Sequence, residues 1–323
     1  MYFNHSNSFF HGIMFHHFHD GSLHKKSQGS ISKDDFYKLI KFIGKKNILD
    51  ADIFFEKFLK KKLKKNEVCI TFDDALKSQV DIALPVLEDL KIKSFFFVYT
   101  SIFDAKPDNL EIFRYFRTHY FNKISDFYKD FYKMLNKDLQ NFYRTKQKRI
   151  KNMTIQFPMY SHEDIKFRLV RDFFLKKNEY EKIIFKMMKE KKFSPKKLYS
   201  KLFFSKKDLK NLNELGHLIG PHSHSHPTLI EKMKYDEQKN EYSKSISIIS
   251  KIIKKEKKYI KWMSHPNGSY NHNTLKILKE LGIKLGFKQF IKIDKERRHK
   301  KINTSFLEIA REDHSNIIRK MKI

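Results

Sequence analysis

Two short clusters of carboxylate and imidazole side chains stand out in this sequence. Asp73 and Asp74 follow an apolar run, and His222 and His226 are four residues apart in a segment bounded by two prolines. Neutral imidazoles combined with one carboxylate suit Zn²⁺ or another divalent transition metal with coordination positions left open. The second carboxylate can then face a water molecule on the metal. These residues indicate hydrolytic chemistry at a metal ion.

Each cluster also has a purely structural interpretation. Asp74 could simply cap the helix that follows it, and the His-rich segment could be a surface tract that takes up metal adventitiously. However, an apolar strand is predicted directly before each cluster. Parallel α/β barrels place their active sites at the carboxyl ends of their strands. The matching positions of the two clusters therefore favour a shared site.

A third segment, SHPNG at residues 264–268, is predicted to form a turn after the run KYIKWM. Pro266 followed by Gly268 exposes backbone N–H groups, and such groups can stabilise a developing oxyanion. A turn of this composition is common. It indicates a function only in combination with the other two clusters.

The surrounding segments predict alternating strands and helices, as in a parallel sheet. A capping box at Ser32 and Asp35 opens a helix that stops at Gly44, and a second box at Ser205 opens a helix that ends at Gly216. Asn273 is expected to cap a helix that runs to Leu281. The predicted strands span residues 11–16, 67–72, 93–100, 217–220, 258–266, 283–287 and 305–310, with further helices at about 77–90 and 234–254.

Residues 104–204 differ in character from the rest. Glycine is absent there, and aromatic residues and lysines recur at helical intervals. We expect a mostly helical insertion within a single domain that spans residues 1–323. The sequence contains no internal repeat and no Gly/Ser linker. It therefore gives no indication of two independent domains.

The composition is that of a globular protein, with 40% hydrophobic residues and 32 phenylalanines. The formal net charge is +31, but the lysines are spread along the chain and only ten residues are arginine. We interpret the excess as a solvated basic surface and expect no specific nucleic-acid partner. Cys69 is the only cysteine and is expected to be buried. Without a recognisable signal peptide or transmembrane segment, the prediction is a cytoplasmic protein.

Together the three clusters resemble the polysaccharide deacetylases, also called the NodB-homology or carbohydrate esterase family 4 domain. The family's T-F-D-D-G motif is matched by residues 71–74, with Ala75 in place of glycine. Its H-[ST]-x-x-H-P motif is matched by residues 222–227, and its Pro-rich turn by Pro266 and Gly268. The segments MFHHF and ALPVLEDLKIKSFFFV also look like this family. The resemblance covers residues 10–103 and 205–312.

The resemblance implies a distorted (β/α) barrel of about seven strands, here with a large, mostly helical insertion. It implies an N-acetylated sugar or glycan as substrate and a divalent metal, most simply Zn²⁺, as cofactor. Asp73 would be the general base that takes a proton from metal-bound water, and the backbone N–H of Asn267 would bind the oxyanion. The implied metal ligands are Asp74, His222 and His226.

Some features depart from the family pattern. The arginine of the third motif is absent, and Ser264 or His265 stands in its place. The D-x-x-x-x-W and L-x-x-x-H motifs have no clear counterpart. Arg311 and His314 are the nearest candidates for the missing groups. Arg311 could orient Asp73 by a bidentate pair, and His314 could protonate the leaving amine. Both could equally be surface residues.

Three further histidines near the matched motifs need no catalytic role. We interpret His16 and His17 as hydrogen-bonding residues at the rim of the barrel, and we expect His224 to point away from the proposed ligands. The leading hypothesis is hydrolysis of an N-acetyl sugar. The alternatives are a hydrolase of another small amide or O-acetyl ester, and a non-catalytic glycan- or polyanion-binding protein with the same fold.

Overall fold

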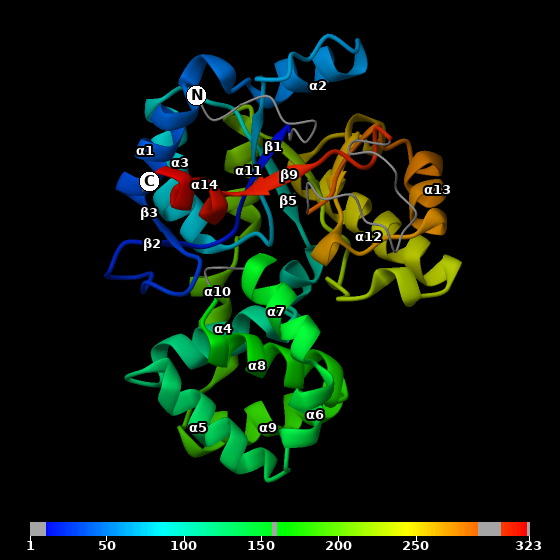
Figure 1. Ribbon diagram of the computed structural model, residues 1–323. Helices are drawn as coiled ribbons and strands as arrows, with labels where there is room; N and C mark the ends of the chain where they lie inside the picture. The colour runs from blue at the N-terminus through cyan, green and yellow to red at the C-terminus, as the bar shows by residue number, and fades with distance from the viewer. Residues whose placement is uncertain (1–10, 157–159, 290–304, 322–323) are drawn as a thin grey trace. The chain divides into compact units, whose positions relative to one another are not determined.

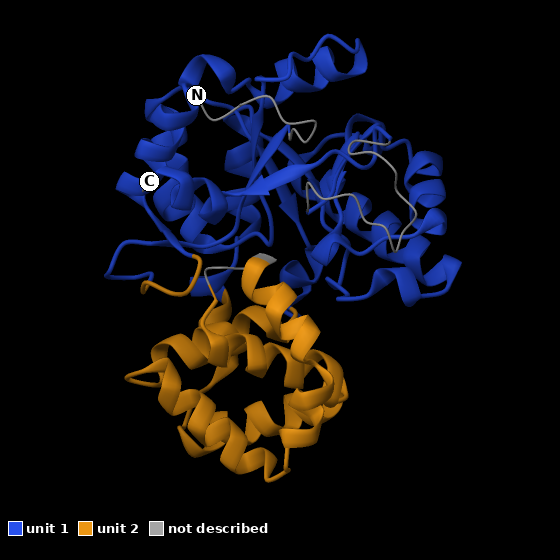
Figure 2. Cartoon of the chain, viewed as in Figure 1, with its two compact units in different colours: residues 1–24, 30–107, 200–323 blue, residues 25–29, 108–199 orange. Residues whose placement is uncertain are grey.

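The computed structural model describes residues 11–156, 160–289 and 305–321. Strands and helices alternate along most of the chain (Figure 1). The chain divides into two compact units, which Figure 2 colours separately. Unit 1 comprises residues 1–24, 30–107 and 200–323, and unit 2 comprises residues 25–29 and 108–199.

Unit 1 is built on a five-stranded parallel sheet with the strand order β6-β5-β4-β1-β9. A second parallel pair joins β7 to β8, and a short one joins β2 to β3. Parallel neighbours need crossover connections, which helices supply here. The predicted α/β class with a parallel sheet is confirmed. The strands are β1 (Gly12–Phe15), β2 (Phe18–His19), β3 (Ile31–Ser32), β4 (Cys69–Phe72), β5 (Phe95–Val98), β6 (Leu218–Pro221), β7 (Trp262–Ser264), β8 (Leu285–Phe287) and β9 (Arg311–Asp313).

The β7-β8 pair meets the larger sheet on two sides. Phe287 of β8 forms a parallel bridge with Ile309, which lies two residues before β9. On the other side, the indole N–H of Trp262 donates to the carbonyl of Ile219 in β6 at 2.8 Å. A Cβ atom at Gly220 would lie 2.5 Å from the carbonyl oxygen of Trp262. Glycine at this position therefore allows β6 and β7 to approach closely.

Alternate side chains of the central strands fill two apolar cores, as expected for strands buried on both faces. Phe95 and Phe97 of β5 pack on one side against Phe287 of β8. On the opposite side, Phe96 stacks on Phe72 of β4, with ring centroids 4.5 Å apart. This packing holds β4 and β5 in the register that places Phe72 opposite Phe96.

Helices of unit 1 cover the sheet and follow the predicted capping signals. The hydroxyl of Ser32 accepts from the N–H of Asp35 at 3.1 Å, and Ser205 accepts from Asp208 in the same way. None of the described helices is long and apolar enough to cross a membrane. The helices of unit 1 are α1 (Lys33–Ile43), α2 (Ala51–Leu59), α3 (Leu84–Asp89), α11 (Lys206–Glu214), α12 (Tyr235–Ile253), α13 (His272–Glu280) and α14 (His314–Met321).

Unit 2 is a helical bundle with its own core. The carboxylate of Asp164 is fully buried there and is paired with Arg168 (2.6 Å), Arg117 (3.5 Å) and the hydroxyl of Tyr128 (2.7 Å). Its helices are α4 (Asn109–His119), α5 (Ile124–Leu135), α6 (Gln140–Thr145), α7 (Gln147–Gln156), α8 (His162–Leu169) and α9 (Lys177–Glu190). The short α10 (Tyr199–Leu202) stands where the chain passes from unit 2 to unit 1.

Two local predictions are wrong, and one predicted strand is shorter than expected. Asn271, not Asn273, caps α13, because its side chain accepts from the N–H of Thr274 and the helix already begins at His272. Residues 305–310 do not form a strand among the described residues. They make a single bridge at Ile309, and ladder pairing with β1 begins at Arg311. The strand expected at 258–266 spans only 262–264, because a helical turn occupies 257–259.

Candidate active site and metal centre

Asp73 and Asp74 lie directly after β4, where the backbone turns sharply. Asp74 and Ala75 both adopt left-handed conformations, with φ of 74° and 53°. Such conformations cost L-residues with a Cβ roughly 1–2 kcal/mol each. The turn lets the two adjacent carboxylates meet different partners: Asp73 faces Arg311, and Asp74 faces the two histidines.

The proposed histidine ligands lie on the loop that follows β6. Glu241 of α12 holds this loop, because its carboxylate accepts from the backbone N–H groups of His224 (2.9 Å) and Ser225 (2.7 Å). The hydroxyl of Ser225 donates to the same carboxylate at 2.8 Å. His226 then adopts a left-handed conformation (φ 57°), and the chain turns back toward His222. The ring centroids of His222 and His226 are 5.1 Å apart.

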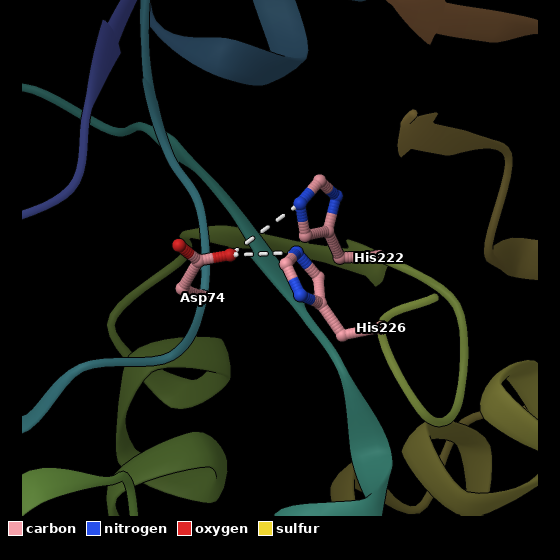
Figure 3. A group of neighbouring side chains, drawn as sticks. All are labelled: Asp74, His222 and His226. Carbon is pink, nitrogen blue, oxygen red and sulfur yellow. Dashed lines mark ion pairs between the residues drawn. The ribbon is translucent and has the colours of Figure 1, made fainter. Parts of the chain in front are cut away.

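The structure brings Asp74, His222 and His226 together in a buried cluster (Figure 3). The Oδ1 atom of Asp74 lies 3.5 Å from Nε2 of His222 and 3.3 Å from Nε2 of His226. One ligand atom from each residue lies within 4.8 Å of the others. Two imidazoles and one carboxylate converging in this way have the chemistry of a divalent-metal site.

The surroundings of His222 support this interpretation. Its Nδ1–H donates to the carbonyl oxygen of Ser264 at 3.0 Å, which turns the lone pair of Nε2 toward Asp74. Burial lowers the pKa of His222 to about 3, against the opposing effect of the Asp73 charge. The ring is therefore neutral at ordinary pH, as a metal ligand must be. The residues present fit a divalent cation.

Asp73 forms a bidentate ion pair with Arg311 of β9, over distances of 2.8 and 2.7 Å. Both side chains are almost fully buried, with 1% exposure for Arg311 and 2% for Asp73. Burial by itself would raise the pKa of Asp73, but the charge of Arg311 and its hydrogen bonds to the carboxylate outweigh the effect of burial. The pKa consequently lies well below its usual range. A Cβ atom at Gly12 would lie 2.7 Å from Cγ of Arg311, so the arginine needs glycine beside it on β1.

Ser264, at the end of β7, links the two halves of the site. Its hydroxyl donates to Oδ1 of Asp73 at 3.1 Å and lies 2.6 Å from Nδ1 of His222. From the sequence, Ser264 was a candidate only as one of two residues at the place of a missing arginine. Its position just before the Pro-Asn-Gly turn was the available signal.

His16, interpreted from the sequence as a rim residue without a catalytic role, lies beside both carboxylates. Its Nε2 lies 3.9 Å from a carboxylate oxygen of Asp73 and 3.9 Å from one of Asp74. Its side chain is 23% exposed, more than either carboxylate. Strand β1 runs parallel to β4 with Phe15 opposite Phe72, so residue 16 emerges level with Asp73. Placing His16 beside Asp73 requires knowing that β1 and β4 are neighbours in the sheet.

The remaining predicted residues occupy nearby elements. His314 is buried, with Nδ1 3.3 Å from the carbonyl of Met14 and its ring stacked on Phe15. His224 is directed toward Thr100, with Nδ1 2.9 Å from its hydroxyl. In the turn after β7, Asn267 is exposed and left-handed (φ 52°), and its neighbours on either side, Pro266 and Gly268, are buried.

Comparison with models of known protein families shows to which family the chain belongs. The family model for polysaccharide deacetylases matches residues 60–162 and 173–286. The chain belongs to the polysaccharide deacetylase family. The deacetylases of this family are hydrolases that use a divalent metal ion. The match includes most of segment 104–204, which the sequence motifs left unmatched, and does not include residues 10–59.

Solved structures of deacetylases share the fold at low sequence identity. The deacetylase PplD of Streptococcus pyogenes, solved in complex with acetate, is 14% identical, with 95% of this chain and 93% of that chain covered and a TM-score of 0.56. IcaB from Ammonifex degensii is 13% identical, with 94% and 91% covered and a TM-score of 0.53. A de-N-acetylase from Aggregatibacter actinomycetemcomitans is 12% identical, with 93% of each chain covered and a TM-score of 0.53. No curated protein sequence matches the chain.

Proposed function

We propose that this polysaccharide deacetylase family member removes an N-acetyl group from a sugar or glycan and requires a divalent metal, most simply Zn²⁺. The observation that carries the proposal is the convergence of Asp74, His222 and His226 beside a second carboxylate, Asp73, that Arg311 holds ionised. A nucleophilic water and a polarised carbonyl are the two requirements of amide hydrolysis, and this set of side chains suits both.

In this proposal each residue has one task. A divalent ion bound by Asp74, His222 and His226 would polarise the acyl carbonyl and lower the pKa of a water molecule. Asp73 accepts the proton of the attacking water, and Arg311 fixes the direction of both its oxygens.

The proposed groups that act on the substrate come from two other elements. The backbone N–H of Asn267, between Pro266 and Gly268, binds the developing oxyanion. His314 supplies the proton to the leaving amine; its Nδ1 lies 3.7 Å from a carboxylate oxygen of Asp313.

We also propose how the chain is organised around this site. Residues 1–323 form one deacetylase domain, and residues 104–204 are an insertion within it. The seven strands of the five-stranded sheet and the β7-β8 pair constitute a distorted barrel. The parallel direction of all these strands and the bridge between Phe287 and Ile309 support this proposal.

The experiment combines metal analysis with acetate release from a panel of N-acetylated sugars. The wild-type protein should contain about one divalent ion per chain and release acetate. Asp73→Asn should abolish release and keep the metal, whereas Asp74→Asn and His226→Ala should lose the metal. Circular dichroism checks that each variant is folded.

Two results would contradict the proposal. Wild-type protein that takes up no divalent metal would remove the basis of the mechanism. Metal-loaded protein that releases no acetate but binds glycan or polyanion would favour the non-catalytic alternative.

A further inference from the structure

Helix α7 of unit 2 exposes an unusually basic surface. Between Leu139 and His162 the sequence contains five basic residues and no aspartate or glutamate. Lys148, Lys151 and Ile155 follow one another at helical spacing of three and four residues, so they share one face of α7. Ile150, on the opposite face, is buried in the small core of this unit.

Two exposed apolar side chains each lie next to one of these cations: Ile155 is one turn from Lys151 on α7, and Phe173 packs against Arg149. Ile155 is 64% exposed and Phe173 is 47% exposed. The guanidinium of Arg149 lies over the ring of Phe173, 3.8 Å from its centroid. We call the surface formed by Lys148, Arg149, Lys151, Ile155 and Phe173 the α7 basic face. No ion pair neutralises its three cations among the residues that the structure describes.

We propose that the α7 basic face docks on an anionic membrane surface. A helix that combines unpaired cations with exposed apolar side chains suits the boundary between charged headgroups and acyl chains. The cations alone would serve any polyanion. Ile155 and Phe173 favour a lipid surface, because a water-soluble polyanion would leave both side chains in water, whereas a bilayer buries them. The local absence of carboxylates supplies the charge complementarity.

Co-sedimentation of the full chain with lipid vesicles tests this inference. Vesicles of phosphatidylcholine with and without phosphatidylserine are compared for the wild type and three variants. The triple substitution Lys148→Gln, Arg149→Gln, Lys151→Gln removes the cations. The substitution Ile155→Ser removes an exposed apolar group. As the matched control, Lys251→Gln, Lys254→Gln, Lys255→Gln removes the same charge from the exposed end of α12 and the residues after it.

The wild type should sediment with phosphatidylserine vesicles and not with phosphatidylcholine alone. Each cation near an anionic surface changes binding about fivefold, so the α7 triple variant should bind roughly 100-fold more weakly. The control should lose far less, and Ile155→Ser should also weaken binding. Equal losses in both triple variants would overturn the inference, because the effect would then follow from net charge. Wild-type binding to phosphatidylcholine alone would overturn it too. Displacement by soluble polyphosphate, with no effect of Ile155→Ser, would assign the surface to a soluble polyanion instead.

Discussion

The ion pair between Asp73 and Arg311 provides the sharpest test of the site's architecture. Both groups are almost fully buried, and two hydrogen bonds of 2.8 and 2.7 Å join them. Removing one partner of a buried pair leaves an uncompensated charge, which typically costs about 3–5 kcal/mol. We therefore expect Arg311→Met and Asp73→Asn each to lower the free energy of unfolding by roughly that amount.

The double variant should not show the sum of these losses. With both charges replaced, no unpaired charge is buried, so Asp73→Asn with Arg311→Met should be about as stable as either single variant, or more so. The coupling energy of the cycle should then be about 3 kcal/mol or more, at the upper end for residues in contact. Urea denaturation of the four proteins, with metal removed by a chelator, measures these values.

The pH dependence of the free energy of unfolding provides a second test of the Asp73–Arg311 pair. Because the folded-state pKa of Asp73 lies below its unfolded value of about 3.9, its stabilisation is complete above that value and is lost as pH falls through the folded pKa. The stability difference between wild type and Arg311→Met should thus shrink below pH ~4. Additive single losses, or a stability difference independent of pH, would show that the two buried charges are not coupled.

Three other substitutions probe the elements that hold the site. Ala75→Gly should raise the free energy of unfolding by up to ~1 kcal/mol, because Ala75 is left-handed at φ 53°; thermal denaturation measures this, and a loss of stability would count against the strain. Glu241→Ala should weaken metal binding about tenfold in a calorimetric titration, since the N–H of Ser225 loses its acceptor; unchanged affinity would show that the loop needs no support. Gly12→Ala should cost about 1–3 kcal/mol in urea denaturation, because the new Cβ would displace Arg311; a neutral effect would mean that the arginine can move freely.

Much of the fold follows from local patterns in the sequence. The capping residues Ser32 and Ser205, the apolar strand ending at Phe72 and the buried run 95–98 are all present in the structure. These features depend on interactions within a few residues, so spacing and residue type suffice to predict them. The four-residue spacing of His222 and His226 was equally visible.

The partners of the site could not be predicted in the same way. Contacts of Asp73 with Arg311 and Ser264 join residues 238 and 191 positions apart. They depend on sheet order, which single-sequence patterns do not specify. The apolar run 305–310 predicted a strand, but the ladder begins only at Arg311, where β1 provides a neighbour. His16 enters the site for the same reason, through the register of β1 against β4.

The position of β9 has a consequence for the synthesis of the protein. Strand β1 lies between β4 and β9, so one of its edges stays open until residues 311–313 have left the ribosome. An unpaired edge strand is a template for aggregation, and such long-range pairing is slow to form. The same late strand carries the cation that faces Asp73. A nascent chain that stalls before residue 311 therefore has both an exposed strand edge and a carboxylate without its counter-charge.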